Sequence, residues 1–82
     1  MARVILTRSF ADLYAKGQVE HDVPGLQVRH LVRGLDERFP GIGRYLEDGV
    51  AVAIDGVIHQ NAFLEEVGLD SEVCFMPAIE GG

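Results

Sequence analysis

The sequence predicts an α+β domain in which one main helix packs on one face of a mixed sheet of four to five strands. Apolar residues repeat at helical spacing in only one segment, residues 28–39, whereas short β-branched runs occur on both sides of it. A single helix on a small curled sheet is a two-layer arrangement that buries the apolar side of both. The 82 residues are enough for one such domain and too few for two.

The first two strands are predicted before the helix. Residues 4–7 form a short run that is rich in β-branched residues and bounded by charged ones, as is typical of a strand. A loop is expected over residues 9–17, and Gly17 is a natural turn point. Residues 18–23 are mostly polar, which favours a second strand at the edge of the sheet.

The helix is predicted from one apolar stripe, formed by Val28, Leu31, Val32, Leu35 and Phe39. Charged residues fill most of the opposite side, and the Pro-Gly pair at residues 40–41 ends the helix. Gln27 is not a capping residue, so the helix start is weakly defined.

Further strands follow an irregular stretch over residues 41–49. Residues 50–54 are typical of a buried strand, and Asp55-Gly56 predicts a type I′ turn into a strand over residues 57–59. Residues 63–67 fit a helical turn or an irregular crossover, and residues 71–76 form the last strand. Strand alternation and the helix stripe predict a core of Val4, Leu6, Leu31, Val32, Leu35, Phe39, Val52, Ile54, Val73 and Phe75.

Charge is unevenly distributed along the chain, which has a net charge of −6. All seven basic residues lie in residues 1–44, whereas residues 45–82 contain eight acids and no base. This balance disfavours nucleic acid as a partner. The acidic half either steers the chain toward a basic partner surface or only keeps it in solution. No apolar stretch approaches the roughly 20 residues of a membrane span, so we expect a cytoplasmic protein without a membrane partner.

Catalytic signatures are absent from the sequence, which contains no phosphate-binding loop, no HExxH motif and no CxxC pair. His21, His30 and His59 have no metal-ligand spacing and are interpreted as exposed polar residues, so no metal is expected. Cys74 is the only cysteine and is better explained by packing than as a nucleophile. The chain is therefore not expected to be an enzyme.

The last residues carry the one feature with a chemical meaning, because the sequence ends in Gly81-Gly82. Such an end is either frayed or functional. Glycine has no Cβ, so two glycines can enter a narrow channel and bring the backbone close to a nucleotide. Five residues beyond Pro77 span at most about 17 Å, enough to reach an active site within a partner.

The second half of the chain resembles the ThiS/MoaD sulfur-carrier family. The resemblance lies in residues 50–56 (VAVAIDG) and above all in residues 69–82 (LDSEVCFMPAIEGG), and residues 31–41 (LVRGLDERFPG) match the family's helix. Asp55, Ala78 and Glu80 depart from the usual pattern. The similarity is closer to the MoaD branch, the small subunits of molybdopterin synthase, than to the thiazole branch.

The resemblance implies a ubiquitin-like β-grasp fold over residues 1–77, followed by a flexible tail over residues 78–82. It also implies that an E1-like adenylyltransferase uses Mg-ATP to adenylate the carboxylate of Gly82, which Gly81 precedes in the channel. A persulfide enzyme then supplies sulfur to form a thiocarboxylate. The acceptor would be the large subunit of molybdopterin synthase, and the carrier itself would bind no cofactor.

A partner-binding surface is predicted around the last strand. Cys74 and Met76 have the opposite parity to the core positions, so they and Ile79 should form an exposed apolar strip that ends near Glu80. Three other functions stay open: a carrier for another sulfur metabolite, a ubiquitin-like modifier of lysines, and a plain interaction module.

Overall fold

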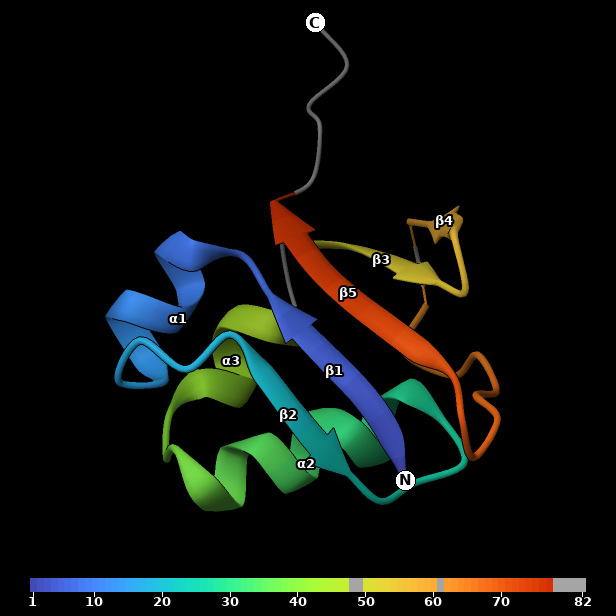
Figure 1. The fold of residues 1–82 in the computed structure, drawn as a ribbon, viewed down its shortest axis with the longest axis horizontal. Coiled ribbons are helices and arrows are strands. Elements are labelled where there is room, and N and C mark those ends of the chain that lie inside the picture. The colour runs from blue at the N-terminus through green and yellow to red at the C-terminus, as the bar shows by residue number, and fades with distance from the viewer. Residues whose placement is uncertain (48–49, 61, 78–82) are drawn as a thin grey trace, which may run out of the picture.

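The computed structural model describes residues 1–47, 50–60 and 62–77. Within these ranges a five-stranded sheet has the order β2-β1-β5-β3-β4 (Figure 1). The two central strands, β1 and β5, are parallel, and the other neighbours are antiparallel. The predicted mixed sheet is thus confirmed, and its strands are β1 (Ala2–Leu6), β2 (Glu20–Val23), β3 (Val50–Ile54), β4 (Val57–His59) and β5 (Glu72–Pro77).

The helices α2 and α3 cover one face of this sheet, whereas α1 lies beside it, beyond the end of β1 (Figure 1). The longest is α2 (Val28–Arg38), which buries four residues of the predicted apolar stripe, whereas the fifth, Phe39, follows the helix. Its first residue follows Gln27, whose side chain makes no capping hydrogen bond, as the sequence indicated. The other two helices are α1 (Arg8–Tyr14) and α3 (Ile42–Glu47). None of the helices in the described ranges is both long and apolar enough to cross a membrane.

The loop predicted over residues 9–17 is wrong, because α1 occupies most of it. Thr7 caps this helix, with its side-chain oxygen accepting a hydrogen bond from the Phe10 N–H at 3.3 Å. Ala11 is fully buried, and the helix gives way to left-handed backbone at Lys16 and Gly17, whose φ values are 54° and 81°. Seven residues contain too few turns for an apolar period to stand out.

The irregular stretch predicted over residues 41–49 is also wrong, because residues 42–47 form α3. This helix buries Ile42 and Leu46, one turn apart, against the core. The Asp36 Oδ1 atom accepts hydrogen bonds from the N–H groups of Gly41 and Gly43, both at 3.0 Å. The capping carboxylate therefore comes from α2, six residues before the helix it caps, where local sequence patterns give no signal.

The core agrees closely with the prediction, since every predicted residue except Phe39 is buried. Phe39 is half-buried and packs against the core edge. His21 was expected to be exposed, but only 3% of it is accessible. It faces inward from β2, its ring lies edge-on to Phe39 at 5.4 Å, and its Nε2 atom is 2.7 Å from the Gln18 carbonyl oxygen. A polar strand can thus hold a buried histidine when its ring nitrogen finds a backbone partner.

The turn between β3 and β4 is confirmed as type I′, because Asp55 and Gly56 have φ values of 49° and 88°. The Asp55 carboxylate also ties this turn to β5: it accepts hydrogen bonds from the Glu72 N–H and from the Ser71 hydroxyl, each at 2.9 Å. Residues 63–67 follow the irregular alternative, with turns and a single antiparallel bridge between Gln27 and Glu66.

Candidate functional site: the end of β5 and the open face of the sheet

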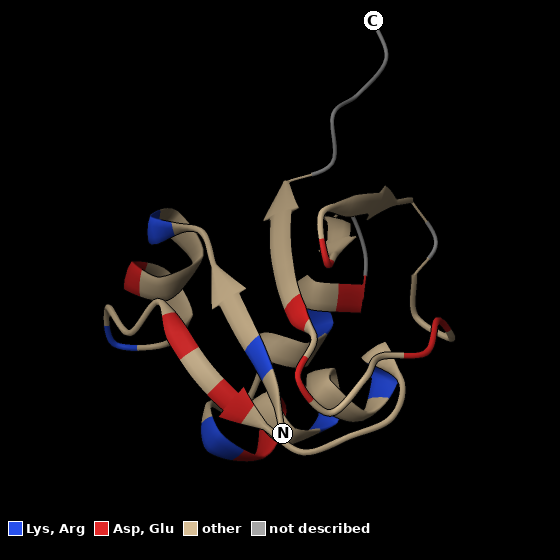
Figure 2. Cartoon of the chain, turned by 45° about the vertical axis from the view of Figure 1, so that its right-hand side comes forward, with Lys and Arg blue, Asp and Glu red and all other residues tan. Residues whose placement is uncertain are grey.

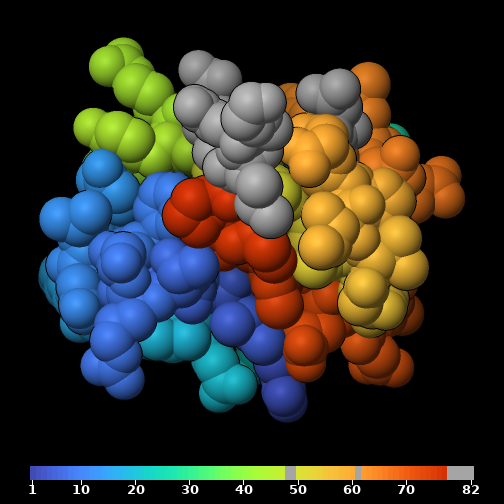
Figure 3. Space-filling model, turned by 90° about the horizontal axis from the view of Figure 1, so that it is seen from above, coloured from blue at the N-terminus to red at the C-terminus, as the bar shows by residue number. Residues whose placement is uncertain are grey.

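The strand β5 is paired on both sides as far as Phe75 and with β3 alone from Met76 to Pro77. It pairs with β1 from Arg3 opposite Glu72 to Leu6 opposite Phe75, and with β3 from Ile54 opposite Val73 to Val50 opposite Pro77. Seen from the end of the sheet where β5 stops, its red terminus reaches the surface between the blue N-terminal segments and the yellow β4 region (Figure 3). The chain beyond Pro77 therefore leaves from a firmly anchored strand.

Four of the predicted site residues, Ile79, Glu80, Gly81 and Gly82, lie outside the described residues. Their roles stay predictions. The predicted division into a domain over residues 1–77 and a tail over residues 78–82 also stays a prediction. What the structure does describe is the base from which these residues extend.

The two faces of β5 differ as the strand alternation predicted. Val73 and Phe75 are buried beneath the helices, whereas Cys74 and Met76 point to the other face and are half-buried rather than fully exposed. We call this second face, which lies toward the viewer in Figure 1, the open face.

The structure adds neighbours to these two residues that the sequence did not identify. Ile5 of β1 and Ala53 of β3 flank Cys74, and Ala51 of β3 flanks Met76. All five residues are uncharged and adjacent across the three central strands, and we call them the apolar strip. Four of them are half-buried, whereas Ala51 is buried. Alternation marks each of them as outward-facing, but only the strand order shows that they are adjacent.

Cys74 is a poor nucleophile in this setting. Burial raises the pKa of its thiol, and the neighbouring Glu72 carboxylate, which is 3.9 Å from the sulfur, raises it further. The thiol therefore stays protonated at neutral pH, and the thiolate is the reactive form. This agrees with the interpretation of Cys74 as a packing residue.

Acidic side chains lie at the opposite end of β5 from Pro77. Glu72 and Asp70 lie at the start of β5, where they line a hollow together with Arg3 and Asp22. Figure 2 shows red segments at the start of β5 and in the segment before it, and also on β2 and the helices, whereas blue segments lie mainly on the helices and β1. Among the residues that the structure describes, no cluster of three or more potential ligands is arranged to hold a metal ion.

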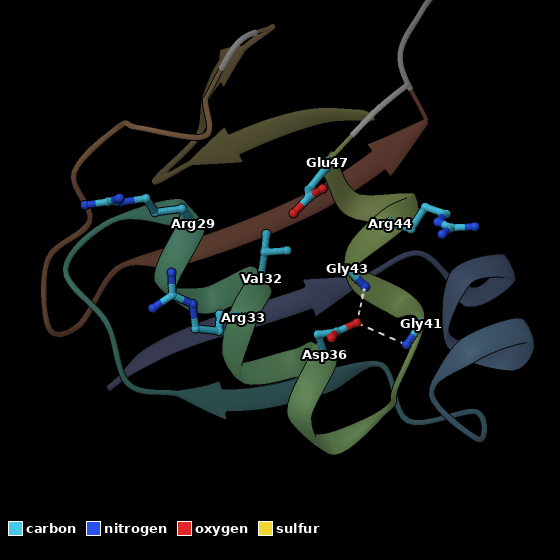
Figure 4. Close-up of a pocket in the computed structure, with 8 residues that line it drawn as sticks. All are labelled: Arg29, Val32, Arg33, Asp36, Gly41, Gly43, Arg44 and Glu47. Carbon is cyan, nitrogen blue, oxygen red and sulfur yellow. Dashed lines mark hydrogen bonds between the residues drawn. The ribbon is translucent and has the colours of Figure 1, made fainter.

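The hollow between α2 and α3, about 430 Å³, does not form a reaction centre. Arg29 and Arg44 extend to opposite sides of it, and the Asp36 carboxylate is turned toward the amides of Gly41 and Gly43 (Figure 4). Its charged groups do not converge on one point where a substrate atom could sit.

Solved structures resemble this chain closely in fold. A chain of the Amycolatopsis orientalis BexX/CysO complex is 17% identical, with a TM-score of 0.85 over 100% of both chains. Mycobacterium tuberculosis CysO is 14% identical, with a TM-score of 0.84 over 96% of this chain and 100% of that one. Small archaeal modifier protein 1 from Methanosarcina acetivorans is 17% identical, with a TM-score of 0.79 over 99% and 95%.

No protein-family model matches the sequence, and no curated protein is significantly similar to it. At these identities the structural likeness establishes the fold and not the chemistry. The mixed sheet with its helices, matched along nearly the full length of these neighbours, gives this chain the ubiquitin-like β-grasp fold.

Proposed function

We propose that this protein is a sulfur carrier whose reactive group is the carboxylate of Gly82. An E1-like adenylyltransferase joins this carboxylate to the α-phosphate of ATP, with Mg²⁺, and releases pyrophosphate. A persulfide sulfur then attacks the acyl carbon and displaces AMP, and a thiol cleaves the resulting acyl disulfide to leave a thiocarboxylate. Adenylation is required because a free carboxylate is a poor electrophile, whereas AMP is a good leaving group.

The observation that carries this proposal is the placement of β5. Its pairing with β1 reaches Phe75 and its pairing with β3 reaches Pro77, and the five residues after Pro77 end in two glycines. An anchored strand followed by a slim end is suited to insertion into a partner's channel, because the domain can dock while the end reaches the nucleotide. The proposal requires Gly82 to carry the free carboxylate.

The acceptor that we propose is the large subunit of a molybdopterin synthase, on the strength of the MoaD-like segments over residues 31–41 and 69–82. An enzyme that builds another sulfur-containing metabolite is the alternative. Transfer of sulfur to one purified acceptor and not to the other distinguishes them.

Deletion of Gly82 tests the carrier mechanism. It moves the carboxylate back by about 3.5 Å, beyond the tolerance of a reaction whose atoms must approach within about 3–3.5 Å. After incubation with the activating enzyme, ATP and a sulfur donor, intact mass should show exchange of oxygen for sulfur in the native chain and no exchange in the variant. Gly81→Val should also block loading, because a β-branched side chain does not fit a narrow channel.

The matched control is Ala78→Gly, which changes the same segment but preserves its length and should load normally. We expect the thermal unfolding of all variants to coincide, and this measurement separates a loss of loading from a loss of folding. Full thiocarboxylate formation by the chain that lacks Gly82 would refute the carrier mechanism.

The open face is proposed as the surface that docks on the activating enzyme and the acceptor. Met76→Glu places a charge within the apolar strip and should weaken binding by about tenfold or more, while the chain stays folded. Leu13→Glu is the matched control, because it adds the same charge to an exposed apolar residue of α1. Titration calorimetry with the activating enzyme measures both, and equal affinities would show that docking lies elsewhere.

A ubiquitin-like modifier is the second candidate, favoured by the structural similarity to small archaeal modifier protein 1. It would use the same activated Gly82 but form an amide bond to a lysine amine with loss of AMP. The same mass experiment separates the two, because a modifier yields high-mass lysine adducts instead of a thiocarboxylate.

A further inference from the structure

The outer edge of β4 is short, at three residues, but it lacks the charged residues and the proline that also protect exposed edge strands. The strand ends the sheet, and its only partner within the described ranges is β3. Val57 and Ile58 are 59% and 58% exposed, and β4 contains neither a charged residue nor a proline. The opposite edge strand, β2, carries the exposed acids Glu20 and Asp22. Charged residues and proline are the common means of preventing strand addition at an edge.

The register of the hairpin aims one residue of β4 outward. In a two-residue hairpin the residues that flank the turn, here Ile54 and Val57, exchange backbone hydrogen bonds, and pairs alternate from there along the ladder. The next such pair is Val52 with His59. Ile58 lies between them, so its N–H and C=O point away from β3, toward the free edge.

The surroundings of this edge are acidic and apolar. Asp55 lies in the turn before β4, and Glu47 and Gln60 line a hollow of about 380 Å³ beyond its other end. The rest of that hollow is apolar, formed by Val28, Leu46, Val50, Val52, Ala62, Phe63 and Leu64. No basic residue occurs anywhere in residues 45–82.

We propose that the free edge of β4 binds an extended segment of a partner protein in which apolar residues alternate with lysine or arginine. The backbone of that segment would pair with Ile58, its apolar side chains would pack beside Ile58, and its basic side chains would lie near Glu47. A second copy of this chain fits less well, because it brings the same acids and a net charge of −6 to the contact. This interaction goes beyond the carrier role and does not depend on Gly82.

The probe is a synthetic nine-residue peptide in which lysine alternates with valine, with both ends blocked. It is titrated into the full-length ¹⁵N-labelled chain at 0.15 M salt. We expect saturable shifts centred on the amides of β4, and exchange of the Ile58 N–H with solvent should slow by about tenfold or more. The same peptide with glutamate in place of lysine should cause neither effect.

Variants at Ile58 separate backbone pairing from general attraction to an acidic protein. Ile58→Pro removes the outward N–H but no bond to β3, and it should weaken peptide binding about tenfold, or 1.4 kcal/mol. Ile58→Thr keeps the N–H and the β-branched shape, and it should bind within about threefold of the native chain. The amide spectrum shows whether each variant is folded.

A second pair of variants holds even if the proline variant fails to fold. Both Ile58→Lys and Ile58→Glu leave the backbone donor in place and change only the side chain. The added positive charge of Ile58→Lys should weaken binding of the lysine peptide, and the added negative charge of Ile58→Glu should strengthen it. Unchanged affinity across this pair would overturn the proposal. So would shifts spread over the acidic surface without protection of the Ile58 amide, or a dimer of the chain paired through β4 without peptide.

Discussion

Phe75 belongs to the core between the sheet and the helices. It lies on β5 between Leu6 of β1 and Val52 of β3, and only 1% of it is exposed. Phe75→Ala should lower the free energy of unfolding by about 3–5 kcal/mol, because it removes a large buried side chain and leaves a cavity. Urea denaturation measures the loss. Met76→Ala, on the half-buried face of the same strand, should cost clearly less, and equal losses would mean that the two faces are interchanged.

The carboxyl group of Asp55 makes the folding stability depend on pH. Hydrogen bonds from the Glu72 N–H, and then from the Ser71 hydroxyl, lower the pKa of its carboxyl below the usual value. A lowered folded-state pKa stabilises the protein above the unfolded value of about 3.9, and this stability is lost as pH falls through the folded value. The Asp55→Asn variant can adopt the left-handed backbone of the turn. Its single side-chain carbonyl oxygen does not replace the two carboxylate oxygens that accept hydrogen bonds from the Ser71 hydroxyl and the Glu72 N–H. We expect its stability deficit to be full near pH 7 and to shrink below pH ~4.

Urea denaturation of both chains at several pH values measures this deficit. A constant difference between the native chain and Asp55→Asn from neutral pH into the acid range would contradict the assignment. The carboxylate would then contribute no charge-dependent bond between the turn and β5.

The joint between α2 and α3 depends on one side chain. Asp36 on α2 accepts the two N–H groups that α3 would otherwise leave unpaired, and Gly43 leaves room for it, since a Cβ there would lie 3.0 Å from its oxygen. Asp36→Ala should therefore cost about 1 kcal/mol of stability, as for the loss of a helix cap. Glu37→Ala, at the next and exposed position of α2, is the control and should cost much less. Thermal unfolding compares them, and equal midpoints would show that α3 needs no cap.

Charge is unevenly distributed along the whole chain, with every Lys and Arg in residues 1–44 and eight acids in residues 45–82. The exposed acids include Glu47, Glu65, Glu66, Asp70 and Glu72, whereas Asp48 lies outside the described residues. If this half steers the chain to a basic partner, association with the activating enzyme should slow as salt approaches 0.5 M, where the Debye length is about 4–5 Å. Stopped-flow measurements give the rate, and an on-rate independent of salt would leave these acids with a role in solubility alone.

Elements with a strong local signal can be predicted from the sequence. The apolar stripe of α2, the β-branched runs of β1 and β3, and the Asp55-Gly56 turn each follow from spacing or from backbone preference within a few residues. The alternation along β5 is enough to separate Val73 and Phe75 from Cys74 and Met76. The two terminal glycines are also visible in the sequence as a candidate reactive site, and their role stays a prediction.

Features that depend on contacts between distant segments follow from the tertiary structure alone. The helix α3 is capped by a residue of α2, which no local pattern indicates. His21 is buried with its ring beside Phe39 and its nitrogen near the Gln18 carbonyl oxygen, although its strand is polar. The strand order brings Ile5, Ala51 and Ala53 next to Cys74 and Met76, and it leaves β4 at an edge. Sequence periodicity shows which way a side chain points, but its neighbours are set by how strands pair across the chain.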